Sequence, residues 1–79
     1  MINFALAGYG TVGQGVMDIF QKRKESIQRR LGKKIDIRYV LVRDSGKTRD
    51  IDFYGAEVVC DIKRILDDAG VQILMEATG

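Results

Sequence analysis

A glycine-rich turn near the N-terminus limits most strongly how this chain can fold. Glycines at positions 8, 10 and 13 follow an apolar run over residues 2–7 and precede a long stretch with helical periodicity. Strand, tight turn and helix in this order are typical of dinucleotide-binding folds. Gly8 permits the sharp turn, Gly10 lets a pyrophosphate approach the backbone, and Gly13 lets the helix pack close to the strand. The open N–H groups at the helix start favour an anion, so we predict a dinucleotide site here, with a plain strand–helix turn as the alternative.

The composition excludes several other classes of protein. The 79 residues suffice for one small domain at most, with a marginal core. A single cysteine, Cys60, excludes an internal disulfide, and without histidine a zinc site has almost no ligands. We therefore expect no metal site and a reducing, cytoplasmic environment. Because histidine is the most usual general base, its absence and the short length argue against a complete enzyme on this chain.

The charge pattern argues against nucleic acid and membranes as partners. The net charge of +2 is too mild to indicate nucleic-acid binding. The cations at the end of the first predicted helix lack the interleaved aromatic side chains of a nucleic-acid surface, so we interpret them as a solvated face. They are Lys22, Arg23, Lys24, Arg29 and Arg30, followed by Lys33 and Lys34. No apolar run reaches the length of a membrane span.

The hydrophobic periodicity predicts alternating strands and helices. Strands are expected at residues 2–7, 35–42, 57–60 and 71–75. A long helix runs from residue 10 or 11 to 31, where Gly32 stops it, and a brief helix capped by Asp61 runs through Asp68. The positions expected to face the core are Val12, Val16, Ile19, Phe20, Ile27 and Leu31 in the first helix and Ile62, Ile65 and Leu66 in the second.

This order of elements, β-α-β-(β)-α-β, predicts an α/β fold. Right-handed crossovers give a partial doubly wound, Rossmann-type parallel sheet with strand order 3-2-1-4. The last strand then lies on an open edge, which is a place for pairing with more protein. We therefore expect a homo-oligomer or pairing through this edge. A small non-enzymatic module that self-associates or docks a partner through the edge is the alternative function.

The end of the second strand indicates which dinucleotide is preferred. In a dinucleotide fold this point lies beside the adenine ribose, where an acid favours NAD and a cation favours NADP. Arg43 and then Asp44 stand there, and the planar guanidinium of arginine can grip a 2′-phosphate. We favour NADP, with NAD tolerated if Asp44 takes the ribose position. Simple polar turn residues are the remaining interpretation.

Three further residues receive structural interpretations. Glu76 ends the last strand and is expected to be a solvated strand end rather than a site acid. Cys60 stands in an apolar context and is interpreted as a buried structural cysteine. Tyr9 is expected to pack over the turn or beside the cofactor, without a chemical role.

Several motifs together resemble one enzyme family. Residues 7–16 are similar to the opening of homoserine dehydrogenases, with the form G-[LYF]-G-T-V-G-x-G-V. Residues 39–44, 47–52 and 65–76 resemble the same family in the same order. The likeness covers the whole chain but only the first part of a much longer protein. It implies an NAD(P)-dependent oxidoreductase that interconverts aspartate semialdehyde and homoserine in amino-acid biosynthesis.

The resemblance also implies roles for particular residues. Residues 8–13 would hold the pyrophosphate and the neighbouring ribose, with backbone N–H groups from Thr11 and Val12. Arg43 would lie near the adenosine 2′ position, and the loop at Thr78 and Gly79 would approach the nicotinamide. The family's catalytic lysine and substrate-binding acids belong to later segments, so no catalytic residue carries over.

The expected domain is therefore incomplete. Residues 1–79 would form the N-terminal part of a dinucleotide-binding domain, with the substrate domain absent. Alone, such a chain is expected to bind the cofactor weakly and not to catalyse. The start of another NAD(P)-dependent amino-acid dehydrogenase or reductase is a further alternative.

Overall fold

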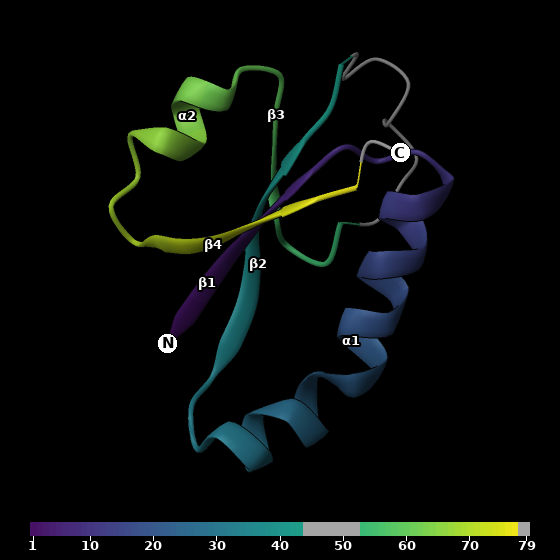
Figure 1. Ribbon diagram of the computed structural model, residues 1–79, viewed down its shortest axis with the longest axis vertical. Helices are drawn as coiled ribbons and strands as arrows, with labels where there is room; N and C mark the ends of the chain where they lie inside the picture. The colour runs from purple at the N-terminus through teal and green to yellow at the C-terminus, as the bar shows by residue number, and fades with distance from the viewer. Residues whose placement is uncertain (44–52, 78–79) are drawn as a thin grey trace.

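A parallel sheet with the order β3-β2-β1-β4 forms the framework of the chain (Figure 1). The computed structural model describes residues 1–43 and 53–77. Their elements are β1 (Ile2–Ala7), α1 (Thr11–Leu31), β2 (Ile35–Leu41), β3 (Glu57–Val59), α2 (Ile62–Leu66) and β4 (Val71–Glu76). All three strand pairings are parallel. The predicted α/β class and strand order are confirmed.

The two helices cover opposite faces of the sheet (Figure 1). Successive side chains of a strand point to opposite faces, so Leu6 packs with Met17 of α1 while Ala5 packs with Ile65 of α2. The α1 side holds the larger apolar cluster. Because both faces of β1 are covered, its continuous apolar run is explained.

The end of α1 and the start of α2 agree with the sequence, whereas the end of α2 does not. Gly32 has a φ of 68°, and its N–H donates to the carbonyl of Gln28, as expected for a glycine that ends a helix. The side chain of Asp61 accepts a hydrogen bond of 2.9 Å from the N–H of Lys63 and so caps α2. α2 ends at Leu66 rather than at Asp68, because the carboxylate of Asp68 accepts from the N–H of Gly70 in a turn toward β4.

The predicted inward positions of α1 were wrong in part. Phe20 is buried, and Val16 and Ile27 pack partly buried against the core, as predicted. Val12, Ile19 and Leu31 are more than half exposed, and Met17 is buried although it was not among the predicted positions. Successive helical residues are about 100° apart, so Val12 and Ile19, each one residue before a buried position, point away from the sheet. Leu31 is the last residue of the helix.

The predicted inward positions of α2 were also wrong in part. Ile62 and Leu66 are exposed, and Ile65 alone of the described residues of α2 is buried.

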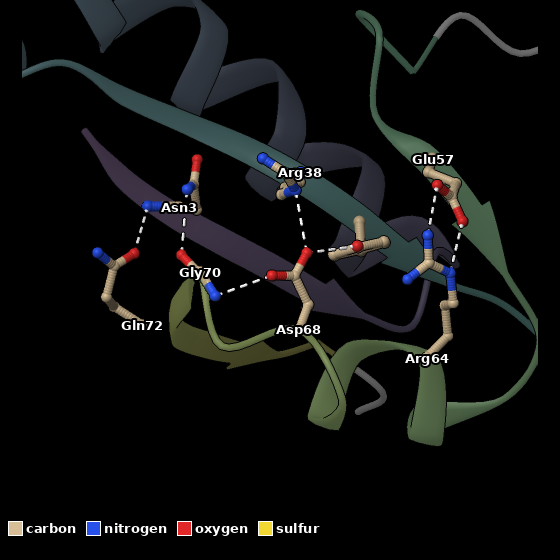
Figure 2. A network of polar contacts seen from close by, with 8 residues as sticks. Asn3, Arg38, Glu57, Arg64, Asp68, Gly70 and Gln72 are labelled. Carbon is tan, nitrogen blue, oxygen red and sulfur yellow. Dashed lines mark hydrogen bonds and ion pairs between the residues drawn. The ribbon is translucent and has the colours of Figure 1, made fainter.

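A polar network joins the turn after α2 to the sheet (Figure 2). Asp68 Oδ2 accepts from the hydroxyl of Tyr39 at 2.5 Å and lies 3.1 Å from Nε of Arg38. At the start of β1, the side-chain amide of Asn3 donates to the carbonyl of Gly70 at 3.1 Å. Asn3, Asp68 and Gly70 lie near the starts of β1 and β4, and Arg38 and Tyr39 lie in the middle of β2. The network therefore ties the sheet to the turn before β4, and none of these residues is the last residue of a strand.

Substitution of Asp68 by asparagine is expected to make the free energy of unfolding less dependent on pH in the acid range. The Tyr39 hydroxyl, the N–H of Gly70 and the charge of Arg38 lower the pKa of Asp68 below its ordinary value. A carboxyl group whose pKa is lower in the folded state stabilises the fold at pH values above its unfolded-state pKa. This stabilisation is lost as the pH falls through the folded-state pKa. Chemical unfolding of both proteins from pH 2 to pH 7 should therefore show a difference at neutral pH that shrinks below about pH 4. A difference that is independent of pH would contradict this role.

No helix among the described residues is both long enough and apolar enough to span a membrane.

Candidate functional site

The glycine turn lies where three parallel strands end together. Gly8 follows β1 with a φ of 95°, a left-handed conformation that glycine adopts without strain. Its N–H donates to the carbonyl of Leu41 at the end of β2, at 2.8 Å. On the other side, the N–H of Ala77 donates to the carbonyl of Ala7 at 2.8 Å. The turn is thus tied to the strands on both sides of β1.

This position is also the point where the strand order reverses. The chain proceeds from β1 to β2 and β3 on one side, then crosses to β4 on the other side of β1. In open parallel sheets, ligands bind outside the carboxyl ends of the strands at such a point. The fold therefore places residues 8–13 at the usual ligand edge of a doubly wound sheet.

The start of α1 is open to an anion. Its N-cap is Gly10, which has no side-chain cap, and no acidic residue stands in the first turn. The N–H of Gln14 already donates to the carbonyl of Gly10 at 3.0 Å, as in a regular helix. N–H groups before that point have no partner within a helix, and the helix dipole adds a partial positive charge there. The arrangement suits a phosphate group.

Two of the glycines serve different purposes. A Cβ atom on Gly13 would overlap the carbonyl oxygen of Gly8, so the close packing of α1 on the turn requires glycine at this position. A Cβ atom on Gly10 would meet no atom within 4 Å from residues 1–43 and 53–77, apart from its two chain neighbours. The packing of the chain therefore accounts for Gly13 but does not account for Gly10.

An aromatic residue far along the chain contacts the turn. The ring of Tyr9 lies against that of Phe53, with centroids 4.7 Å apart and planes inclined by 58°. Tyr9 thus packs at the turn, in agreement with one of its two expected positions. Phe53 was not among the predicted site residues, because it stands in a stretch without helical or strand periodicity.

Arg43 reaches the same edge of the sheet. β2 ends at Leu41, Val42 is buried and bonds through its N–H to the carbonyl of Val59, and Arg43 follows with an exposed side chain. The hydrogen bond from Gly8 to Leu41 therefore ties the turn to β2 two residues before Arg43.

Of the remaining predicted site residues, some lie at the start of α1 and the others lie outside the described residues. Thr11 and Val12 are the first two residues of α1, directly after the glycine turn. Asp44, Thr78 and Gly79 lie outside the described residues. The residues 1–43 and 53–77 hold no cluster of acidic or sulfur ligands suited to a metal ion.

Two other residues were interpreted from the sequence. Glu76 is the last residue of β4 and is exposed, as expected for a solvated strand end. The prediction that Cys60 is buried was wrong, since its side chain is exposed. Side chains alternate along a strand, and the buried position at the end of β3 belongs to Val59.

The outer strand β4 leaves apolar side chains uncovered. Ile73, Leu74 and the neighbouring Leu66 of α2 are exposed, the last by 68%. They contribute to the lining of a shallow groove of about 150 Å³ between α2 and β4. Self-association or partner docking through this edge stays a prediction, which sedimentation velocity of the 79-residue chain would test.

Comparison with known proteins identifies the relatives of the chain. No protein-family model matches it. The homoserine dehydrogenase of Bacillus subtilis is 32% identical over 78 residues, and that of Helicobacter pylori is 33% identical over 78 residues. The homologues of this chain are homoserine dehydrogenases. Each of these matches covers 99% of this chain but 18% of the relative, so the chain spans about a fifth of the length of its curated relatives.

Solved structures of homoserine dehydrogenases share the fold. The Staphylococcus aureus enzyme superposes with a TM-score of 0.88 at 38% identity, over 99% of this chain and 20% of that one. The Thiobacillus denitrificans enzyme gives a TM-score of 0.80 at 29% identity, over 95% and 17%. The resemblance seen in the glycine turn and the later motifs is therefore confirmed as homology to homoserine dehydrogenases.

Proposed function

We propose that residues 8–13 bind a dinucleotide of the NAD(P) class as the phosphate-binding segment of a homoserine dehydrogenase. The observation that carries the proposal is the open start of α1, where Gly10 has no side-chain cap and, among the described residues beyond its two neighbours, none would come within 4 Å of a Cβ atom on it. Homology to homoserine dehydrogenases supports the same ligand class.

The chain's own residues would bind and orient the cofactor. Backbone N–H groups at Thr11 and Val12 would donate to the pyrophosphate, where the dipole of α1 favours negative charge. Arg43 would face the adenosine 2′ position, and Thr78 and Gly79 would approach the nicotinamide. When bound, the nicotinamide supplies a hydride acceptor or donor for interconverting aspartate semialdehyde and homoserine. We assign no catalytic residue to this chain, and we expect it alone to bind weakly and not to turn over.

Isothermal titration of the folded 79-residue chain with NADPH and NADH tests the proposal. Heat of binding with either nucleotide, saturating at one site, is the expected result. Absence of heat with both nucleotides, on a sample whose circular dichroism shows the folded state, would overturn it.

Substitution of Arg43 by alanine is expected to reduce the preference for NADP over NAD. Hydrogen bonds to a charged phosphate are worth about 1.5–3 kcal/mol, so the affinity for NADP should fall roughly ten- to hundredfold. The affinity for NAD should change little. Arg30→Ala removes the same charge from an exposed position in the last turn of α1 and is the matched control. An equal loss for both nucleotides would contradict a contact with the 2′-phosphate.

A further inference from the structure

Phe53 makes a contact that the dinucleotide motif does not include. Its ring is only 8% exposed and belongs to the apolar cluster between α1 and the sheet. This ring makes a tilted contact with the ring of Tyr9, the residue between the first two glycines of the turn. A buried residue of the core therefore contacts the middle of the candidate phosphate-binding segment directly.

The ring of Tyr9 has two neighbours. One is the ring of Phe53, with 4.7 Å between ring centroids. The other is the first turn of α1, since a Cβ atom on Gly13 would be 3.8 Å from Cδ1 of Tyr9. The contact with Phe53 thus holds the Tyr9 ring beside the start of the helix.

The position of Phe53 is itself defined by a tight turn. The N–H of Ala56 donates to the carbonyl of Phe53 at 3.0 Å. Between them, Tyr54 and Gly55 have φ values of 55° and 88°, as in a type I′ turn. A bulky residue such as Tyr54 rarely adopts a positive φ, and it keeps one only where the surrounding structure imposes it.

Glycines make the turn at residues 8–13 costly to order. Glycine loses more conformational freedom on folding than any other residue, so three of them in six positions favour alternative conformations. When only a fraction of molecules has the binding conformation, the apparent affinity falls by that fraction. A side chain that holds the turn in place therefore raises affinity without touching the ligand.

We propose that Phe53 is a positioning residue for the dinucleotide, acting through its ring contact with Tyr9. The contact keeps the N–H groups at the start of α1 directed toward the pyrophosphate. This inference rests on the proposed function. Aromatic pairs of this kind are worth enough to change the ordered fraction of the turn, and hence the nucleotide affinity, by about three- to tenfold.

The chain offers a matched pair of variants for the test. Phe20 belongs to the same cluster, is 7% exposed, and pairs with Phe4 at 5.4 Å, on α1 away from the glycine turn. Phe53→Leu and Phe20→Leu should both lower the melting temperature. At a temperature where both are folded, Phe53→Leu should raise the Kd for NADPH about three- to tenfold, and Phe20→Leu should leave it within twofold. Phe53→Tyr, which keeps the ring, should restore affinity.

Amide hydrogen exchange without nucleotide gives a second readout. Exchange at residues 8–13 should be faster in Phe53→Leu than in Phe20→Leu, and Phe53→Tyr should reverse the change. Equal Kd values and equal exchange in the two leucine variants would overturn the inference. Failure of the unchanged chain to bind NADPH would instead overturn the proposed function. If Phe53→Leu does not fold, Tyr9→Leu removes the partner ring from a partly exposed position and is measured in its place.

Discussion

Gly13→Ala is expected to lower the melting temperature by about 5–20 °C and to abolish measurable nucleotide binding. The added Cβ would overlap the carbonyl oxygen of Gly8, which is backbone and cannot rotate away. Relief requires α1 to move from the turn, and overpacking of this kind costs about 1–3 kcal/mol. For a domain of this size each kcal/mol corresponds to roughly 4–8 °C. The displaced helix start would no longer face the pyrophosphate.

Gly15→Ala makes the same chemical change two residues later and is the control for this experiment. A Cβ atom there would meet no described residue within 4 Å outside the adjoining part of its own helix, and the position lies inside α1. Alanine is favoured over glycine in a helix by about 1 kcal/mol, so this variant should be more stable than the unchanged chain. Thermal unfolding followed by circular dichroism gives the melting temperatures of both variants. Equal stability of Gly13→Ala and the unchanged chain would show that the close approach is not essential.

The order of the elements could be predicted because its signals are local. An apolar run marks β1, Gly32 ends α1 by adopting a left-handed φ, and Asp61 caps α2 through its own side chain. Each signal involves residues within a few positions of one another. Right-handed crossovers then leave few ways to arrange four parallel strands, so the strand order followed from the element order.

The exposure of individual apolar side chains could not be predicted from local signals. Periodicity shows which residues share a row of a helix, but it does not show whether another element covers that row. Ile19 and Leu66 are apolar at helical spacing, yet both are exposed. The burial of Cys60 was wrongly predicted for a related reason, since a shift of one residue along a strand exchanges the two faces.

The site was predictable as far as the motif extends along the chain. The three glycine roles follow from residues 8–13, and the position of Arg43 follows from the end of β2. The contact between Tyr9 and Phe53 joins residues far apart in sequence and leaves no local pattern. Phe53 could only have been found from its aromatic, apolar character within a mainly polar stretch, which also holds Ile51 and Tyr54.

Gly10→Ala is expected to weaken NADPH binding by a hundredfold or more while the fold is kept. The φ of Gly10 is −87°, which alanine adopts, and in the part of the chain that the structure describes the new Cβ would meet no atom within 4 Å beyond the two neighbouring residues. Alanine is a poorer N-cap than glycine, so a drop in melting temperature of about 5 °C or less is expected. In the complex, however, the methyl group would occupy the space through which the pyrophosphate approaches the backbone.

The size of this effect follows from the bonds that would be lost. Two charge-assisted hydrogen bonds of about 1.5–3 kcal/mol each amount to at least a hundredfold in affinity. Fluorescence titration with NADPH measures the loss, and thermal unfolding of the same sample shows whether the fold is kept. Unchanged affinity would mean that the ligand does not approach Gly10. A large loss of stability would mean that this glycine serves the fold, as Gly13 does. Only lost binding with retained stability makes the empty space beside Gly10 the place of the phosphate.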